Sequence, residues 1–309
     1  MSEDTPRRDR PAPFGLEGVP PEVIEAYRLD RLPLDRPGRG MTDLLRLDGK
    51  VALVTGSGGH GLGNAIAHRL AEAGASVAVL DVDAQAASVA ADELSGTWGV
   101  EARPFVANVG DWAQAHQAVQ AVVDQWGTVD VLVNNAGGSG SVGTDGRTLQ
   151  GGGSFASLSR EDIDLTVTVN LTGVMYMTRA VLGPMLSRRS GRIINISSEG
   201  GKIGLAGGVP YNSCKAALIG FTRNLAHEVG SEGISVVAVC PGVMVTERLV
   251  RRGAFPASSD GSFAALLGRT TLGRFSIPDE VASAVAFLAS EAGSYIHGTA
   301  LSVGGGLAD

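Results

Sequence analysis

The sequence is poor in cysteine and lysine and has no long apolar run. Its two cysteines, Cys214 and Cys240, lie in apolar segments, and two cysteines cannot build a disulfide framework. We therefore expect them to be reduced core residues of a cytoplasmic protein. No segment approaches the roughly 18 apolar residues that a membrane span requires. The Arg pair near the N-terminus has no apolar run behind it, so neither a secretory nor a twin-arginine signal is expected.

A surplus of basic charge is also absent. The formal net charge is −7 and the pI is near 5.3. No run of basic residues with interleaved aromatics occurs, so nucleic acid is not an expected partner. We assign no metal ligands. The hydrophobic share of 44% is enough for a sizeable core, and 309 residues suit one α/β domain or two small ones.

Residues 1–48 differ in composition from the rest of the chain. They are rich in Pro, Arg and Asp, and the apolar patch at 21–27 is long enough for one or two helical turns. Two interpretations of this extension stay open: a disordered tail, or an arm that packs on its own subunit or on a neighbour. The main domain is expected to comprise residues 49–309.

A strand, a glycine-rich turn and a helix follow directly. Residues 51–54 form a continuous apolar run, typical of a strand buried on both faces of a parallel sheet. The turn at 55–63 is rich in glycine, and an amphipathic helical pattern spans 64–73. Glycine lets the backbone approach a pyrophosphate, and a helix N-terminus supplies free N–H groups and a positive dipole. This order of elements predicts a phosphate-binding cradle.

A second apolar strand, 76–80, ends in Asp81. A carboxylate at this position can accept hydrogen bonds from the adenosine ribose hydroxyls, and it repels a 2′-phosphate. We therefore expect NAD(H) as the cofactor, with NADP(H) less favoured. The alternative is an ordinary aspartate in a turn at the end of a strand.

Strand and helix patterns alternate along the remainder of the chain. Such alternation predicts right-handed βαβ crossovers and a doubly wound parallel sheet, that is, an α/β fold. The further strands are expected at 103–107, 129–133, 192–197, 234–239 and 299–303. The further helices are expected at 111–126, 160–186, 211–227 and 277–290.

The stretch from Ser198 to Lys215 carries the expected chemistry. It leaves the strand at 192–197, crosses a glycine-rich loop and enters an apolar-periodic helix near Tyr211. Tyr211 and Lys215, four residues apart, share a helix face. A free phenol has a pKa of about 10. An ammonium one turn away lowers that pKa, so Tyr211 could exchange a proton during turnover. The alternative is a surface tyrosine that precedes a lysine by chance.

Together these features resemble the short-chain dehydrogenase/reductase family over about residues 48–307. The matching residues, besides the glycine-rich turn, are Asp81, Asn134-Asn-Ala-Gly137, Asn170, Ser198, Tyr211-x-x-x-Lys215, Pro241-Gly and Val303-Gly-Gly. The resemblance implies a single Rossmann-type domain with a parallel sheet of about seven strands flanked by helices. It also implies NAD(P) as cofactor and hydride transfer between a secondary alcohol and a ketone as the reaction.

The resemblance further implies an Asn-Ser-Tyr-Lys catalytic set. In such a set Ser198 hydrogen-bonds the substrate oxygen, Tyr211 exchanges the proton, and Lys215 also binds the nicotinamide ribose. Asn170 would hold a water that passes protons to solvent. The implied cofactor contacts are Gly56, Ser57, His60, Gly61, Leu62, Asp81, Val82, Asn108, Val109, Asn135, Ala136, Gly137, Tyr211, Lys215, Pro241, Gly242, Val243 and Thr246. Because family members commonly assemble through the helices that contain Asn170 and Tyr211, a homotetramer or homodimer is expected.

Three positions depart from the family pattern. Four residues, 57–60, separate the first two glycines of the motif where three are usual, and a bulge is expected there. Asn108 stands where an aspartate near the adenine is usual, and Gly304 replaces a common aspartate. None of these positions belongs to the catalytic set.

The substrate cannot be identified from the loops that would line it. These are the Gly- and Ser-rich loop 137–153, which is either a lid or an inert insertion, the loop 204–210, and the segment 247–274, which is typical of a mobile flap. Two other function classes stay open. One is a lyase or epimerase on the same fold. The other is a non-catalytic NAD-binding regulator, which would lose Tyr211 or Lys215; both are present.

Overall fold

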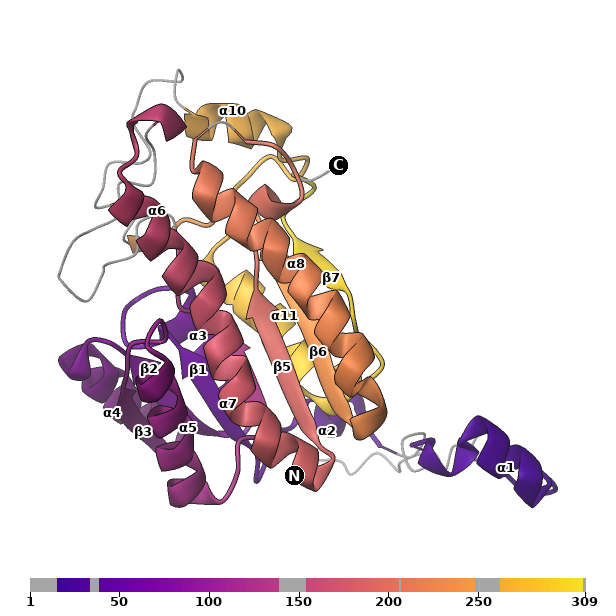
Figure 1. Ribbon diagram of the computed structural model, residues 1–309. Helices are drawn as coiled ribbons and strands as arrows, with labels where there is room; N and C mark the ends of the chain where they lie inside the picture. The colour runs from indigo at the N-terminus through magenta and orange to yellow at the C-terminus, as the bar shows by residue number, and fades with distance from the viewer. Residues whose placement is uncertain are drawn as a thin grey trace, which may run out of the picture.

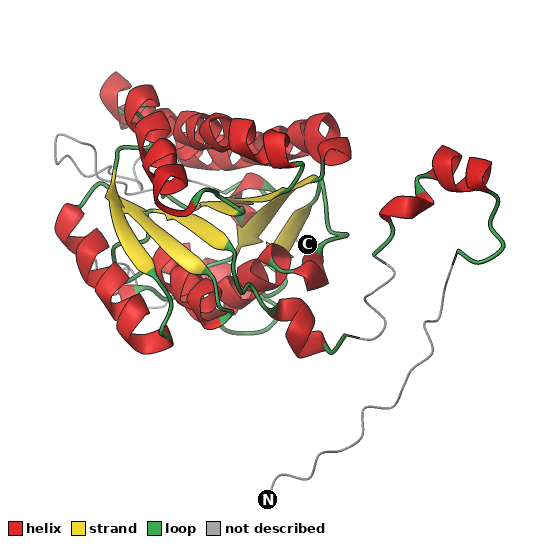
Figure 2. Cartoon of the chain, turned by 90° about the horizontal axis from the view of Figure 1, so that it is seen from below, coloured by secondary structure: helices red, strands yellow, loops and turns green. Residues whose placement is uncertain are grey.

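A computed structural model describes residues 16–33, 39–138, 154–205, 207–247, 250 and 262–307, and its central element is one sheet between two layers of helices (Figures 1 and 2). Every pair of neighbouring strands is parallel. The 7 strands are β1 (Val51–Thr55), β2 (Ser76–Asp81), β3 (Ala102–Val106), β4 (Val131–Asn134), β5 (Gly191–Ile196), β6 (Ile234–Pro241) and β7 (Ala300–Val303). The predicted doubly wound parallel sheet is confirmed.

The strand order β3-β2-β1-β4-β5-β6-β7 reverses between β1 and β4. The chain builds outward from β1 to β3 and then returns to place β4 on the other side of β1. Because all strands are parallel, their C-terminal ends share one edge of the sheet. Ligands of such sheets bind at this edge, beside the reversal.

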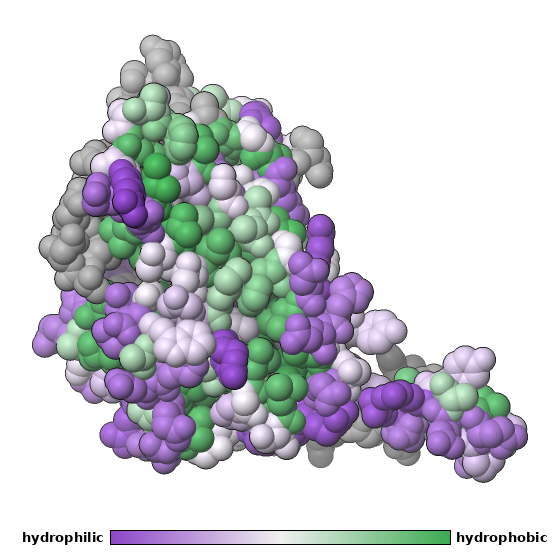
Figure 3. Space-filling model, viewed as in Figure 1, coloured by the Kyte–Doolittle hydropathy of each residue, from purple (hydrophilic) through white to green (hydrophobic). Residues whose placement is uncertain are grey.

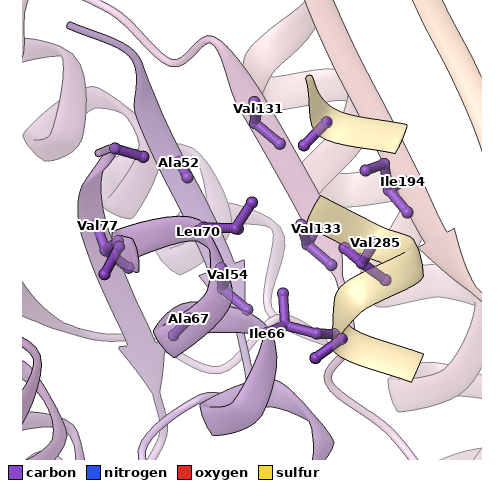
Figure 4. Packing of buried hydrophobic residues seen from close by; sticks show 14 of the residues in the cluster. Ala52, Val54, Ile66, Ala67, Leu70, Val77, Val131, Val133, Ile194 and Val285 are labelled. Carbon is purple, nitrogen blue, oxygen red and sulfur yellow. The ribbon is translucent and has the colours of Figure 1, made fainter. Parts of the chain in front are cut away.

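Each strand contributes to two separate hydrophobic cores, because successive side chains point to opposite faces. Ala52 and Val54 belong to the first core, while Val51 and Leu53 belong to the second. The helices of the first core, part of which Figure 4 shows, are α3 (Leu62–Glu72), α4 (Ala84–Trp98) and α11 (Pro278–Ala289). The helices of the second core are α5 (Trp112–Trp126), α7 (Gly173–Arg188) and α8 (Val209–Val229).

The helix expected at 160–186 is present and contains a π-helical turn. The helix α6 (Arg160–Val167) passes into a π-helical turn, η4 (Thr168–Thr172), before α7 begins at Gly173. The predicted helix is therefore confirmed, with a local change of winding that its sequence did not reveal. A π turn widens the helix locally, and such turns are frequent at functional sites. Asn170 lies in the middle of this one.

Other element bounds differ little from expectation. The helix α8 begins at Val209, two residues early, with Pro210 in its first turn. Part of the segment 247–274 is helical, as α10 (Ser262–Arg269). Residues 248–249 and 251–261 of that segment lie outside the described residues, as do 139–153 of the Gly- and Ser-rich loop. Within the described ranges, no helix is long and apolar enough to cross a membrane.

The first part of the N-terminal extension projects to one side of the sheet and its helices (Figures 1 and 2). It reaches the domain through Arg31, whose guanidinium donates to the carbonyl oxygen of Ser231 at 3.5 Å. The helix α1 (Pro21–Tyr27) confirms the expected helical turns, and η1 (Leu29–Arg31) follows it. Residues 16–33 include no buried side chain. This part of the chain therefore adds nothing to either core.

The second part of the extension is attached to the domain. Arg39 pairs with Glu291, and α2 (Met41–Leu45) follows. Leu47 is only 3% exposed and belongs to the first core. The proposed boundary at residue 48 thus lies one residue beyond a core side chain.

Deleting residues 1–40 should leave a folded protein with a cooperative thermal transition. The deletion removes the Arg39–Glu291 pair, and partly exposed pairs of this kind contribute about 1 kcal/mol or less. Adding Leu47→Ala to the deletion should lower the free energy of unfolding by about 2–5 kcal/mol, as for other buried leucines. Calorimetry checks both variants. A non-cooperative transition after the deletion alone would contradict this expectation, whereas a change of oligomer size alone would support an interface role for the arm.

Candidate active site

The glycine-rich turn after β1 brings backbone segments into close contact. Gly56 has φ +65°, and a Cβ on it would lie 2.9 Å from Cα of Ala136. A Cβ on Gly63 would overlap the carbonyl oxygen of Gly56. No side chain caps α3, whose N-cap is Gly61. The first N–H groups of α3 and its positive dipole end are therefore open to an anion, which fits the pyrophosphate of a dinucleotide.

The extra residue of the turn is accommodated just before α3. The N–H of Gly61 donates to the carbonyl oxygen of Gly59 at 2.9 Å, and both glycines face open space. His60 between them is exposed. Ser57 is fully buried, and its hydroxyl donates to the carbonyl oxygen of Val54 at 2.8 Å. The hydroxyl of Ser57 therefore stabilises the start of the turn.

Asp81, at the end of β2, bonds directly to the glycine-rich turn. Its Oδ2 accepts from the N–H of Gly58 at 3.0 Å, and its Oδ1 accepts from the N–H of Asp83 at 3.2 Å. The carboxylate is half-buried next to the exposed Val82. Gly58, the turn and Asp81 thus form a continuous polar rim at the ends of β1 and β2.

Asn108 and Val109 follow β3 on the same rim. The Oδ1 of Asn108 accepts from the N–H of Gly110 at 3.0 Å, and its N–H donates to Gln114 Oε1 at 3.0 Å. Val109 is buried. The side-chain oxygen of Asn108 therefore stabilises its own turn.

Thr55, which was not among the expected site residues, joins β1 to the end of β4. Its Oγ1 accepts from the N–H groups of Asn135 and Ala136, both at 3.0 Å. The Nδ2 of Asn135 donates back to the carbonyl oxygens of Thr55 at 2.9 Å and Gly56 at 3.0 Å. Because Thr55 is buried, these bonds are shielded from water and make the two turns one rigid wall. In the sequence, the position of this hydroxyl at the end of an apolar strand could have identified Thr55 as a site residue.

Asn170 is completely buried in the π turn and binds the loop after β4. Its Oδ1 accepts from the N–H of Gly138 at 2.8 Å, and its Nδ2 donates to the carbonyl oxygens of Thr166 at 3.0 Å and Gly138 at 3.3 Å. A Cβ on Gly137 would lie 2.6 Å from Asn170 Oδ1 and 3.6 Å from Lys215 Nζ. The predicted residues Gly137, Asn170 and Lys215 therefore meet at one point.

Ser198 is the N-cap of η5 (Glu199–Gly201). Its Oγ accepts from the N–H of Gly200 at 3.1 Å, and the residue is half-buried. Since this bond uses a lone pair, the hydroxyl proton remains able to donate to a substrate oxygen. A Cβ on Gly200 would overlap Asn212 Oδ1, and one on Gly201 would lie 2.7 Å from the N of Ala216. The turn with Ser198 thus packs tightly on the first turns of α8.

Tyr211 and Lys215 share one face of α8, as predicted, with the Lys215 ammonium 5.6 Å from the centroid of the Tyr211 ring. Lys215 is 3% exposed, and its Nζ donates to the carbonyl oxygen of Ile196 at 2.8 Å. In return, the hydroxyl of Ser197 donates to the carbonyl oxygen of Lys215 at 2.7 Å. Burial lowers the pKa of the ammonium from 10.5 to about 8, because water no longer stabilises its charge.

The remaining expected cofactor contacts lie after β6. The N–H of Gly242 donates to the carbonyl oxygen of Val303 at 3.1 Å. Val243 accepts from the N–H of Ser276 at 3.1 Å, which holds the segment leading to Thr246 beside the end of the sheet. The catalytic set and these residues share the C-terminal edge with the glycine-rich turn.

A chain of buried amide and hydroxyl groups beneath this edge was not predicted. The Nδ2 of Asn134 donates to Thr178 Oγ1 at 3.0 Å and to Asn195 Oδ1 at 2.9 Å, and the Nδ2 of Asn195 donates to Thr222 Oγ1 at 2.9 Å. These bonds connect α7 and α8 through β4 and β5. Polar residues inside otherwise apolar strands were the signal that could have revealed them.

Cys214 and Cys240 are free and buried, as expected. Burial raises the pKa of both thiols. Among the residues that the structure describes, no three His, Cys, Asp or Glu side chains gather as metal ligands would.

Comparison with known proteins gives consistent matches over most of the chain. The family model of the short chain dehydrogenases matches residues 50–255. The cyclohexanol dehydrogenase of Rhodococcus sp. (strain TK6) is 38% identical over 86% of this chain and 99% of its own. Among solved structures, a 7α-hydroxysteroid dehydrogenase complexed with NADH and a 7-oxo bile acid has a TM-score of 0.76 and 30% identity, over 87% of this chain and 98% of its own. A gluconate 5-dehydrogenase from Burkholderia cenocepacia J2315, complexed with NADP and tartrate, has a TM-score of 0.76 and 32% identity over the same shares.

Replacing Lys215 by Met should stabilise the fold at neutral pH. The folded-state pKa of Lys215, about 8, lies below the value of 10.5. The cost of burying the ammonium is therefore fully present below pH 8, and it declines as the pH rises towards 10.5. In thermal melts from pH 6 to 10, the melting temperature of the variant should exceed that of the wild type at pH 7. The difference between the two melting temperatures should shrink above pH 8. The exposed Lys50, changed to Met, is the control. A difference in melting temperature that does not change with pH would contradict the lowered pKa of Lys215.

Proposed function

We propose, from the premise that this chain belongs to the short-chain dehydrogenase family, that it is an NAD(H)-dependent oxidoreductase interconverting a secondary alcohol and a ketone. Membership rests on the family model and on relatives at 38% identity. Family members act as oxidoreductases on alcohols and ketones. The observation that carries the finer proposal is that Tyr211 and the buried Lys215 share one face of α8, with Gly137 lying beside both Lys215 and Asn170. Ser198 lies at the same edge, where the sheet binds ligands.

In this proposal the bound dinucleotide supplies or accepts the hydride. Tyr211 gives a proton to the substrate oxygen during reduction and takes it back during oxidation. Ser198 donates a hydrogen bond to the same oxygen, since its own lone pair is held by Gly200. Lys215 holds positive charge one turn from the phenol, which favours the phenolate, and it would also bind the nicotinamide ribose. Asn170 fixes the loop after β4 and would hold the water that passes protons to solvent.

The proposed assembly is a homotetramer or homodimer formed through α7 and α8. Figure 3 shows hydrophobic residues gathered over the face where these two helices lie. Met175 and Leu186 of α7 and Val209 of α8 are exposed in the single chain. We also propose a cytoplasmic location, which the reduced cysteines support.

Changing Tyr211 to Phe should abolish turnover and leave cofactor affinity nearly intact, because only the transferable proton is lost. A panel of secondary alcohols and ketones, monitored through NADH absorbance, identifies a substrate and gives the rates. The expected loss is about 10²–10⁴-fold. Tyr295→Phe, at a fully exposed tyrosine, is the matched control. A Tyr211→Phe variant that keeps more than about a tenth of the wild-type rate could not be reconciled with a general acid–base role.

NADH should bind more tightly than NADPH. Asp81 is held at the glycine-rich turn by Gly58, and no Arg or Lys lies in the turn at 56–63 or directly after Asp81. A 2′-phosphate there would lie close to the Asp81 carboxylate, which is also negatively charged, in a partly desolvated crevice. Fluorescence titration should give at least about a tenfold preference, equivalent to about 1.4 kcal/mol. Asp81→Ala should reduce this preference for NADH over NADPH. Asp92→Ala, at an exposed aspartate of α4, should leave the preference unchanged. Equal or tighter binding of NADPH to the wild type would refute the assignment.

A further inference from the structure

The residue after Ser198 is a buried acid without a partner. Glu199 is 1% exposed, and neither of its carboxylate oxygens has a hydrogen-bond partner among the described residues. Burying a polar or charged group without a partner costs free energy, so each such group in a native structure requires a reason. None of the roles assigned to the catalytic set uses Glu199.

The side chain of Glu199 occupies the space that Gly304 leaves. A Cβ on Gly304 would lie 2.7 Å from Glu199 Cγ and 3.0 Å from its Cδ. Gly304 in turn packs against Gly242, where a Cβ would lie 2.9 Å from Cα of Gly304. Glu199 therefore reaches from η5 to the backbone that follows β6 and β7.

The other side of the same turn is fixed by α8. Gly200 and Gly201 lie against Asn212 and the backbone of Lys215 and Ala216 so closely that neither has room for a side chain. The turn with Ser198 is thus held between α8 on one side and the Glu199–Gly304 contact on the other. Moving Glu199 would release one of these two supports.

The charged groups near Glu199 do not account for its placement. The ammonium of Lys202, three residues on, is bound to the carbonyl oxygen of Ala300 and to Ser302 Oγ on β7. Cys240, which is influenced electrostatically by both Glu199 and Lys202, is a buried thiol with a raised pKa. The contact that the structure does provide for Glu199 is its packing on Gly304.

We infer that Glu199 is a positioning residue: seated against Gly304, it sets the orientation of η5 and thereby the direction of the Ser198 hydroxyl. The inference rests on the proposed function, in which Ser198 donates to the substrate oxygen. Misplacing a catalytic group by about 1 Å can cost about 10²-fold in rate. Replacing Glu199 should therefore lower kcat, and it should do so only when Ser198 is present.

A double-mutant cycle tests this pathway. Glu199→Ala should lower kcat about tenfold or more, with KM and NADH affinity changed less than threefold, whereas Glu199→Gln keeps the volume and should keep most of kcat. In a Ser198→Ala background, Glu199→Ala should have little further effect, because independent sites would give additive losses. Glu93→Ala, at an exposed glutamate, is the matched control. Additive losses, or a Gln variant as impaired as the Ala variant, would overturn the inference.

Combining substitutions at positions 199 and 304 gives a second, independent readout. Gly304→Asp should lower both kcat and thermal stability because the new side chain collides with Glu199, and Glu199→Ala combined with Gly304→Asp should recover most of both. A double variant no better than Gly304→Asp alone would overturn the inference. If the wild type shows no NAD-linked turnover, the proposed function itself fails, and the thermal recovery still decides whether 199 and 304 fill one space.

Discussion

The site depends on a buried ammonium held at the end of a buried strand. Lys215 donates from α8 to the carbonyl oxygen of Ile196, and Ser197 donates back to the carbonyl oxygen of Lys215. This reciprocal pair fixes the helix that carries Tyr211 to the strand that leads into Ser198. Removing the ammonium from water costs folding free energy. Active sites often retain such a cost because the geometry it secures is what the reaction needs.

The sheet beneath the site is tied to its helices by polar as well as apolar contacts. Asn134 and Asn195 sit side by side on neighbouring strands and extend to Thr178 and Thr222 on α7 and α8. Directional hydrogen bonds of this kind have a defined geometry, whereas apolar packing alone tolerates small shifts. These bonds hold α7, which follows the π turn of Asn170, and α8, which carries Tyr211 and Lys215, against β4 and β5.

The sequence determined the sheet and the pairing of Tyr211 with Lys215, because apolar runs between glycines and a four-residue spacing are local signals. It did not reveal the π turn at 168–172, since one inserted residue barely alters the hydrophobic periodicity of a long helix. The contact of Glu199 with Gly304 could not be predicted either. It joins residues about a hundred positions apart, and only the folded strand ends bring them together.

The burial of Lys215 also limits how the protein can be attached to a surface. The other lysines are Lys50 and Lys202, and both are exposed. Lys50 precedes β1 at the edge of the sheet opposite the site, whereas Lys202 lies beside the turn of Ser198. Amine-reactive supports therefore couple only through these two side chains and the α-amino group. With Lys202 changed to Arg, the remaining lysine would attach the domain with its ligand-binding edge facing the solution.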